Sequence, residues 1–403
     1  MRRALIATVG TGMGDDAEAT RSIAHAISTS IRVANPERVV FVVSGESLER
    51  TIPEVKAELG DFADLDSEFI LVERIDDLND VFSRVCRKIA ELKDSGYDVV
   101  VDFTSGTKAM SAGAVLAAVS EATRVSYVSG RRVGGRVARG GEQVLTYTPL
   151  MGIARMQEKL AGELFNLHQF AASQRILDSL KSQIPEPEFS ERMAELSGVV
   201  RGYHLWDMFR HERAFELLKK SRRVPSHNKE FLGKLCSKEE KEPFFIADLI
   251  NNAERRLEEG KYDDALARLY RTMELIAQYR LEAVHGIVTR DVDLSEVPEA
   301  VRGKYSRLRD EDGRIRLGLF RAYELLSDLE DELGKKFVSN RRLHNLLKRR
   351  NDSILAHGIT PVDEDTVSQL RKVAVELAGQ VVASLESLME KARFPKFEQL
   401  TQH

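Results

Sequence analysis

The sequence has little cysteine, no net positive charge and no long hydrophobic run, and each shortage excludes a class of protein. Its two cysteines, Cys86 and Cys236, are too few for a disulfide framework or a four-thiolate zinc site. The net charge of −4 excludes a globally basic nucleic-acid binder, although a local basic patch can still bind a polyanion. No apolar run reaches the roughly 18 residues of a membrane span, and the N-terminus lacks a signal-peptide core. We therefore expect a cytoplasmic protein with no membrane association.

The length and the remaining composition indicate an ordinary globular protein of more than one domain. The chain has 403 residues, of which 42% are hydrophobic and 31% are charged. Disordered chains have fewer apolar residues and a more one-sided charge. A chain of this length exceeds what one hydrophobic core usually serves, so two or three domains are expected.

Short apolar runs rich in Val and Ile recur through the first 130 residues. They are Ala4–Val9, Val39–Val43, Phe69–Val72, Val99–Phe103 and Val125–Val128. The segments between them have helical spacing, as at Val81, Val85, Ile89 and Leu92. Strands that alternate with helices predict a parallel sheet covered on both faces, which is a Rossmann-like α/β fold. The basic, Gly-rich Arg131–Arg139 and the alternating Gln143–Thr148 predict a closing hairpin.

From Leu150 onward the pattern is helical, so we expect an all-α C-terminal region. Proline interrupts it at 185–187, 225 and 243. The strongest helix is predicted over Tyr262–Arg280. Its buried stripe consists of Tyr262, Ala265, Leu266, Leu269, Met273 and Ile276.

Three loops of the N-terminal domain have the chemistry of a phosphate site. They are Gly10-Thr11-Gly12, Ser44-Gly45-Glu46 and Thr104-Ser105-Gly106-Thr107-Lys108, each directly after a predicted strand. Ligands of parallel α/β sheets bind at that edge, where glycine permits close backbone approach and helix N-termini attract anions. The alternative is that these Gly, Ser and Thr residues only cap helices and form turns. A dinucleotide-binding fingerprint is disfavoured, because the third glycine of the first loop is not at the required spacing. A P-loop is disfavoured, because Thr107 separates Gly106 from Lys108.

The stretch Asp102–Ser111, after a first strand that ends in Gly10-Thr11-Gly12, resembles the CARF domain, the CRISPR-associated Rossmann-like sensor of type III immune systems. The resemblance covers roughly residues 1–148. It implies a homodimer whose paired edges bind one cyclic oligoadenylate across the two-fold axis. The residues it assigns to that site are Gly10, Thr11, Gly12, Ser44, Ser105, Gly106, Thr107 and Lys108.

Near the C-terminus, a basic segment carries Arg350, Asn351 and His357. Leu343, Leu346, Leu347, Ile354 and Leu355 predict one helix that continues into the last turn before Gly358, with Arg350 and His357 about 10 Å apart along one face. An arginine can neutralise phosphate charge, and a histidine can transfer a proton near neutral pH. Such a set can direct a ribose 2′-hydroxyl onto its own phosphate without a metal ion. The alternative is a capped surface helix with a basic face.

The same segment resembles the HEPN ribonucleases, whose signature is an arginine, four to six residues, and a histidine. Arg280 and His285 fit the signature too, as do Arg222 and His227 around Pro225, so the spacing alone leaves the active pair open. The Arg350-Asn351 dipeptide favours Arg350, Asn351 and His357 as the catalytic residues. Glu274 is a candidate to orient Arg350, with an ordinary surface pair to Arg271 as the alternative.

The whole chain resembles the type III CRISPR ribonucleases that join CARF, a helical connector and HEPN. The resemblance implies domains at 1–148, 149–245 and 246–403, and a metal-independent endoribonuclease that cleaves single-stranded RNA when cyclic oligoadenylate binds. Two other classes stay open. One is a CARF-type transcription regulator, and the other is a non-catalytic helical scaffold. A metal-dependent nuclease is disfavoured, because no Asp/Glu/Lys constellation of the restriction-enzyme kind is found.

Overall fold

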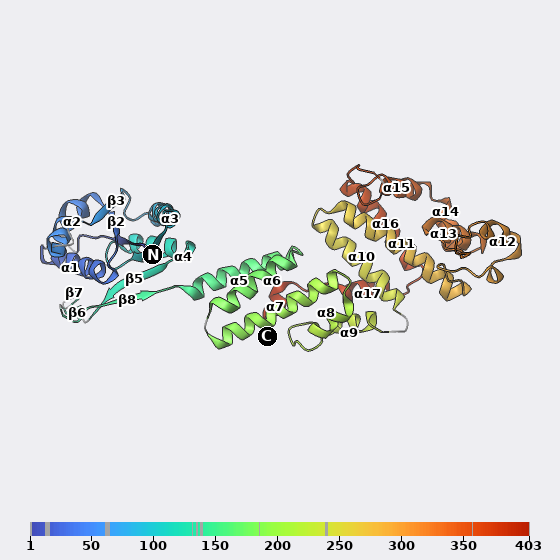
Figure 1. Cartoon of the computed structure of the whole chain (residues 1–403), viewed down its shortest axis with the longest axis horizontal. Coiled ribbons are helices and arrows are strands. Elements are labelled where there is room, and N and C mark those ends of the chain that lie inside the picture. Colours follow the sequence, from blue (N-terminus) through green and yellow to red (C-terminus); the bar gives the residue numbers. More distant parts are fainter. Residues whose placement is uncertain are drawn as a thin grey trace. The chain divides into compact units, whose positions relative to one another are not determined.

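The computed structural model describes residues 2–12, 17–60, 65–130, 132–133, 136–137, 140–184, 186–237, 241–356 and 358–402. The chain divides into two compact units, Met1–Gln157 and Glu158–His403 (Figure 1). The first unit is a mostly parallel sheet with helices, and the second is helical, which is the predicted fold class. None of the helices in the described ranges is both long enough and apolar enough to cross a bilayer.

The first unit is built on a six-stranded sheet in the order β3-β2-β1-β4-β5-β8. The strands are β1 Arg2–Thr8, β2 Arg38–Val43, β3 Asp66–Leu71, β4 Tyr97–Asp102, β5 Arg124–Ser129 and β8 Gln143–Tyr147. The first five pair in parallel, and β8 pairs antiparallel with β5. All six were predicted from the apolar runs and the alternation. The antiparallel β8 closes the sheet where the hairpin was predicted. Between β5 and β8, the short strands β6 Arg132–Val133 and β7 Arg136–Val137 form a separate antiparallel pair, and Arg131 and Arg139 lie outside the described residues.

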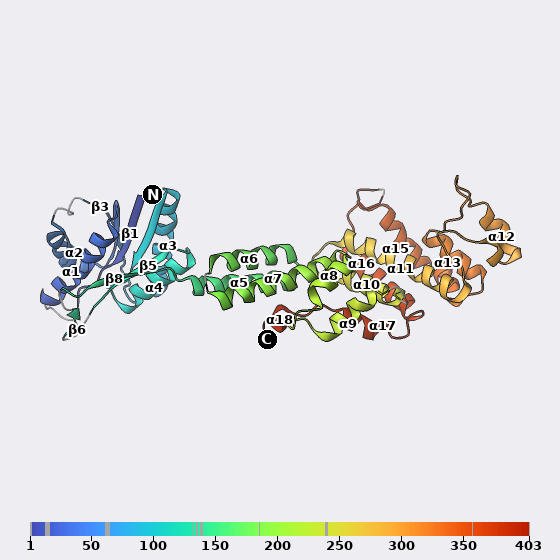
Figure 2. The ribbon, with the colours of Figure 1, turned by 60° about the horizontal axis from the view of Figure 1, so that its bottom comes forward.

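Two helices cover each face of this sheet (Figure 1 and Figure 2). They are α1 Ala17–Ala34, α2 Gly45–Leu59, α3 Leu78–Asp94 and α4 Lys108–Ser120. Alternate residues of β1 point to opposite faces, so Leu5 packs with the core of α1 and α2, and Ile6 packs with that of α3 and α4. The predicted helical positions Val81, Val85 and Ile89 are fully buried in the second of these cores. Each buried aliphatic side chain of this size contributes about 1.5–3 kcal/mol.

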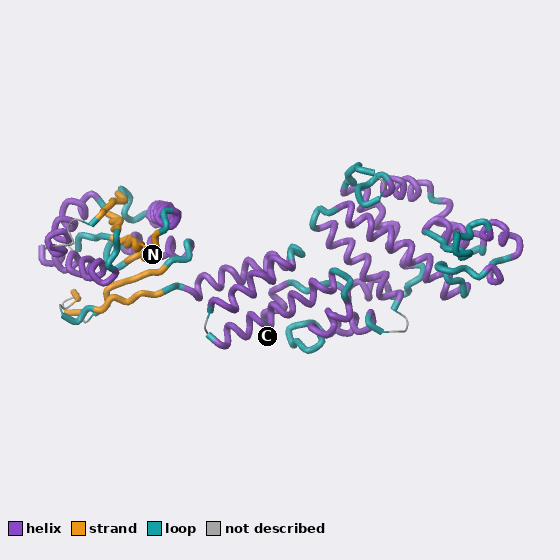
Figure 3. The backbone as a smooth tube through the Cα atoms, in the orientation of Figure 1, coloured by secondary structure: helices purple, strands orange, loops and turns teal. Residues whose placement is uncertain are grey.

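Helices and the loops between them make up the rest of the described residues (Figure 3). Their bounds are α5 Leu150–Asn166, α6 Phe170–Gln183, α7 Pro187–Asp207, α8 His211–Leu218, α9 Ser226–Leu235, α10 Glu242–Glu258, α11 Tyr262–His285, η2 Leu294–Glu296, α12 Glu299–Ser306, α13 Leu319–Asp328, α14 Glu332–Ser339, α15 Arg341–Asn351, α16 Glu364–Gly379, α17 Leu385–Ala392 and α18 Phe397–Thr401. The predicted Tyr262–Arg280 helix is α11, which packs against α10, α13, α15 and α16. Leu266, Leu269, Met273 and Ile276 of its predicted stripe are fully buried.

The last segment of the chain returns to the helices that follow the sheet domain. α17 packs against α9 and α10, and the Phe394 ring lies 5.0 Å from the Trp206 ring of α7. Asn228 of α9 donates to the backbone oxygens of Lys391 at 2.8 Å and Arg393 at 3.0 Å. The C-terminal residues therefore complete the core around α7 to α10.

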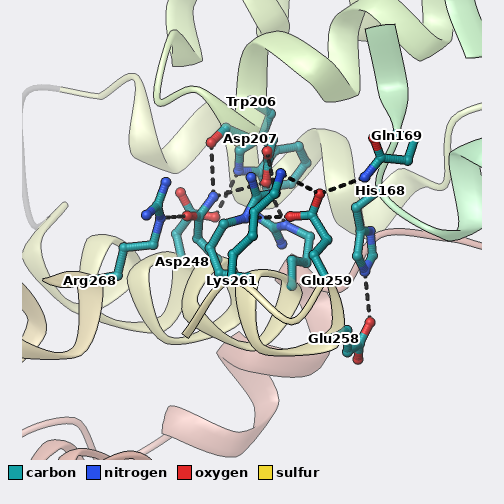
Figure 4. A network of polar contacts seen from close by, with 12 residues as sticks. His168, Gln169, Trp206, Asp207, Asp248, Glu258, Glu259, Lys261 and Arg268 are labelled. Carbon is teal, nitrogen blue, oxygen red and sulfur yellow. Dashed lines mark hydrogen bonds and ion pairs between the residues drawn. The ribbon is translucent and has the colours of Figure 1, made fainter. Parts of the chain in front are cut away.

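A buried polar network joins α7 to α10 (Figure 4). Asp207, the last residue of α7, accepts from Arg255 at 2.8 Å and from Arg256 at 2.7 Å. Asp248 accepts from the Trp206 indole at 2.9 Å. Burying two arginines is costly unless carboxylates compensate them, and Asp207 does so for both, with Glu259 at 2.9 Å from Arg256 as a second partner.

Candidate functional site

The three predicted ligand loops lie along one edge of the sheet. β2, β1 and β4 are adjacent and parallel, so the loops after Val43, Thr8 and Asp102 emerge together at the carboxyl edge. A β-carbon on Gly10 would lie 2.9 Å from the Gly106 amide nitrogen, so these two loops meet backbone to backbone. Thr51 of α2 donates to the Gly10 oxygen at 2.8 Å and ties the α2 side to the same edge. We call these loops, residues 10–12, 44–46 and 104–108, the rim.

Three of the predicted rim hydroxyls make internal hydrogen bonds. The Ser105 hydroxyl accepts from the Gly10 amide at 3.0 Å. Thr107 caps α4 by accepting from the Met110 amide at 3.2 Å, and it donates to the Ile75 oxygen at 2.8 Å. Ser44 caps α2 in a reciprocal pair with Ser47. These contacts build the rim, as the capping alternative predicted.

The remaining predicted residues leave polar groups open at the rim. The Thr11 hydroxyl makes no hydrogen bond to any described residue, while the Thr11 backbone oxygen accepts from Thr20 at 3.0 Å. Lys108 is exposed at the first position of α4 and has no ion pair within the described ranges. The α4 N-terminus has no acidic residue in its first turn, so its amides and Lys108 present positive potential.

Asp102 is a rim-supporting residue that the motif did not assign. Its buried carboxylate accepts from Ser30 at 2.6 Å, from Ser126 at 3.0 Å and from the Thr104 amide at 2.9 Å. Burial raises the pKa of Asp102, and the hydrogen bonds from Ser30, Thr104 and Ser126 oppose that rise without cancelling it. An acid that ends an otherwise apolar strand is the sequence signal for such a role.

The helix that carries Arg350 ends earlier than predicted. α15 stops at Asn351, and turns follow from Asp352 to Ala356. Ile354 is 66% exposed and Leu355 is 49% exposed, so they do not continue the buried stripe of the leucines before them. The separation of about 10 Å along one helix therefore does not apply.

The reversal after α15 is held by backbone contacts. The Gly358 amide donates to the Ser353 oxygen at 3.2 Å, and the Thr360 amide donates to the Asp352 oxygen at 3.0 Å. A β-carbon on Gly358 would overlap the Asp352 oxygen, so only glycine fits there. His357, the predicted proton-transfer residue, lies outside the described residues.

Arg350 is held by an aromatic ring. Its guanidinium carbon lies 4.4 Å from the centre of the Tyr270 ring on α11. Its Nη1 donates to the exposed Asn351 side chain at 3.4 Å, and its buried Nε has no hydrogen-bond partner among the described residues. Glu274 is bonded to Arg271 at 2.7 Å, as the surface-pair alternative predicted. No carboxylate within the described ranges therefore neutralises Arg350.

The competing Arg280 and His285 pair shares one buried carboxylate. Asp331 Oδ2 accepts from Arg280 Nε at 2.8 Å and lies 3.1 Å from His285 Nε2. The Asp331 side chain is 2% exposed and also caps α14 through the Leu333 amide. Burial would raise the pKa of Asp331, but the hydrogen bonds from Arg280, His285 and Leu333 lower it below the ordinary 3.8. This pair therefore connects α11 to α14.

The other pair that fits the signature, Arg222 and His227, lies at the surface. Arg222 is exposed in the turn before Pro225, and His227 is exposed in the first turn of α9. In the part of the chain that the structure describes, no three His, Cys, Asp or Glu side chains are placed to hold a metal ion.

Two family models match the sequence. The model described as the Csm6 6H domain matches residues 153–245, and the one described as the Csm6 HEPN domain matches residues 235–380. Together these matches extend over more than half of the chain. No curated protein sequence matches it.

One solved structure resembles the whole chain in fold, and two others align with about half of it at low TM-scores. Enterococcus italicus Csm6 bound to cyclic hexa-2′-fluoro-hexa-dAMP aligns over 100% of this chain and 98% of its own, with 15% identity and a TM-score of 0.59. A type III CRISPR defence DNA nuclease activated by cyclic oligoadenylate aligns over 52% of this chain and 34% of its own, at 17% identity and a TM-score of 0.27. Can2 from Sulfobacillus thermosulfidooxidans in complex with cyclic tetra-adenylate aligns over 53% and 68%, at 12% identity and a TM-score of 0.26.

Proposed function

The chain belongs to the Csm6 family of CRISPR-associated CARF–HEPN proteins, and we propose that it cleaves single-stranded RNA without a metal ion once cyclic oligoadenylate binds its N-terminal domain. We assign residues 1–148 to the CARF domain, 149–245 to the helical connector and 246–403 to the HEPN domain. The 6H and HEPN matches at 153–245 and 235–380 support the last two assignments.

The observation that carries the proposal is that Arg350 has no ion pair among the described residues. Its guanidinium is unpaired with any described carboxylate, so its donors are available to phosphate oxygens. Arg280, by contrast, donates to a buried carboxylate at 2.8 Å. Of the arginines that fit the signature on a helix, Arg350 is therefore the one suited to neutralise a phosphorane.

The cleavage chemistry follows from the residue types. The ribose 2′-oxygen attacks the adjacent phosphorus, the bond to the 5′-oxygen breaks, and the products are a 2′,3′-cyclic phosphate and a 5′-hydroxyl. Arg350 stabilises the negative charge that develops on phosphate, and Asn351 positions the RNA. His357 orients the 2′-hydroxyl or transfers the proton that the step releases.

A second copy of the chain completes the centre in this proposal. Around the reversal after α15, Ile354 is 66%, Leu355 is 49% and Ile359 is 88% exposed. Large aliphatic side chains gathered on one exposed loop favour contact with another protein surface. An isologous contact there would place two copies of Arg350, Asn351 and His357 on one RNA strand.

The rim is the proposed site of the activator. Enterococcus italicus Csm6, whose fold this chain shares, was solved with a cyclic hexanucleotide analogue. Here Thr11, Lys108 and the α4 N-terminus would contact the ring. Gly10, Gly12 and Gly106 would let the loops pack closely beneath it, because a β-carbon on each would lie 2.8–3.3 Å from other atoms of the protein. Ser44, Ser105 and Thr107 would shape the loops through the hydrogen bonds described above. A ring that binds the competent dimer more tightly than the idle one shifts the equilibrium towards cleavage.

A cleavage assay tests the proposal. The purified full-length chain is mixed with EDTA, a fluorescent single-stranded RNA and cyclic oligoadenylates of different ring size, one at a time. We expect cleavage with one ring only, and none by Arg350→Ala or His357→Ala, while Arg222→Ala cuts normally. Activator-dependent binding of duplex DNA without RNA cleavage would favour a transcription regulator, and an inert protein would favour a scaffold.

A further inference from the structure

The ring of Tyr270 is the contact that fixes Arg350 from outside its own helix. The guanidinium carbon sits 4.4 Å from the ring centre, within the range of a cation–π interaction. Among the described residues, the other polar contact of Arg350 is with its neighbour Asn351, at 3.4 Å, which is long for a hydrogen bond. The Nε atom is buried without a hydrogen-bond partner among the described residues. Within the same residues, the Asn351 side chain is the one acceptor near the two outer nitrogens.

A ring suits this task better than a carboxylate would. A carboxylate would pair with the guanidinium, and a phosphate would then have to compete for the same donors. Glu274 lies one helical turn after Tyr270, but Arg271 holds it at 2.7 Å. The same Arg271 nitrogen also donates to Gln278 at 3.1 Å. Glu274, the acidic residue nearest to Tyr270 on this face of α11, therefore pairs with Arg271 and not with Arg350.

Tyr270 is itself fixed by the core. It follows the fully buried Leu269 on α11 and is half-buried. Burial raises the pKa of its phenol, Arg350 opposes that rise and Glu274 adds to it, so the ring stays neutral. Its hydroxyl makes no hydrogen bond to any residue in the described ranges. The contact therefore uses the face of the ring and not the hydroxyl.

We infer that Tyr270 is a positioning residue that holds the Arg350 guanidinium by its aromatic face and leaves the outer donors free for the scissile phosphate of RNA. This inference rests on the proposed ribonuclease function. It goes beyond the signature residues, because Tyr270 lies on a different helix and is part of no motif.

The test compares three variants of the full-length chain. Tyr270→Phe keeps the ring, and Tyr270→Leu removes it. Tyr279→Leu is the matched control, because Tyr279 is also half-buried on α11 and no described cation lies over its ring. With saturating activator, we expect Tyr270→Leu to lower kcat about tenfold with KM changed less than kcat. Tyr270→Phe and Tyr279→Leu should stay within about twofold of wild type, and all three should share the Tm and activator affinity of wild type.

A binding cycle shows whether Tyr270 acts through Arg350. The probe is a 2′-O-methyl RNA oligonucleotide, which cannot be cut by 2′-hydroxyl attack. We expect Tyr270→Leu to weaken its binding in the wild-type background and to have no further effect in Arg350→Ala. Equal losses in both backgrounds, equal kcat losses for Phe and Leu at 270, or a wild-type kcat for Tyr270→Leu would each overturn the inference. A wild-type protein that cuts no RNA with any ring overturns the proposed function and this inference together, whereas an active wild type with an unaffected Tyr270→Leu overturns the inference alone.

Discussion

Gly10 and Gly106 touch through their backbones, because a β-carbon on Gly10 would lie 2.9 Å from the Gly106 amide nitrogen. Gly10→Ala would therefore push the two rim loops apart. We expect it to weaken binding of the activating cyclic oligoadenylate about tenfold, since relieving such a clash costs about 1–3 kcal/mol. Isothermal titration of the activator measures the effect. Gly303→Ala, on the exposed side of α12, is the control, because a β-carbon there meets nothing within 4 Å, and equal affinities for the two variants would contradict the prediction.

Lys108 is the exposed cation of the rim. Lys108→Gln should lower the affinity for the activator about tenfold, because a hydrogen bond to a charged group contributes about 1.5–3 kcal/mol. The loss should shrink as salt is raised, because exposed charges are screened. Lys56→Gln, in the last turn of α2, provides a matched loss of one exposed charge and should bind the activator normally. The same loss for both lysines would indicate a nonspecific effect of net charge.

Asp331 gives a pH dependence with a defined sign. Its pKa in the folded protein is lowered, so the stability it contributes is present above the ordinary value of 3.8 and is lost as the pH falls through the folded value. Asp331→Asn should lower the free energy of unfolding by about 2 kcal/mol at pH 7. Denaturant unfolding of wild type and variant from pH 7 down to pH 3 measures the difference. If the difference in unfolding free energy between wild type and Asp331→Asn stays constant below pH 3.8, the lowered pKa of Asp331 is contradicted.

Asp207 compensates two buried arginines, which donate to it at 2.8 Å and 2.7 Å. Asp207→Ala should destabilise the helical unit by about 3–5 kcal/mol, because Arg255 would keep its charge without a described carboxylate and Arg256 would retain only Glu259, 2.9 Å away. The exposed pair of Arg321 and Glu324, 2.6 Å apart, is the comparison. Glu324→Gln should change the stability by less than about 0.5 kcal/mol. Chemical denaturation of both variants measures the contrast, and similar losses would mean that the network in Figure 4 is solvated.

Hydrophobic periodicity predicted most of the fold because the elements bury one face each. Val81, Val85 and Ile89 are buried as their spacing requires, and the predicted α11 helix continues to His285 before Gly286 ends it in a left-handed conformation. The end of α15 was predicted wrongly, since Ile354 and Leu355 stand at helical spacing but are exposed on turns. Local spacing does not distinguish a continuing helix from a loop whose apolar side chains face outward.

The candidate site was predictable only in part. The alternation of strands and helices implies parallel strands, so it predicts that the rim loops share one edge of the sheet. The order that makes β2, β1 and β4 neighbours came only from the structure. The sequence could not predict which of the rim hydroxyls cap helices, because Ser and Thr side chains can either cap a helix or bind a ligand. Asp331 lies 51 residues after Arg280, and Tyr270 stacks on Arg350 from a separate helix. Such partners are set by tertiary packing and leave no local signal.

The ends of the RNA fragments made by the activated protein in EDTA test the central claim most directly. Attack by the 2′-hydroxyl on a centre that contains Arg350, Asn351 and His357 predicts 2′,3′-cyclic phosphates and 5′-hydroxyls. We expect these ends only when cyclic oligoadenylate is present, and no fragments from Arg350→Ala. Fragments with 3′-hydroxyl and 5′-phosphate ends, or fragments that appear equally without any cyclic oligoadenylate, would contradict the account.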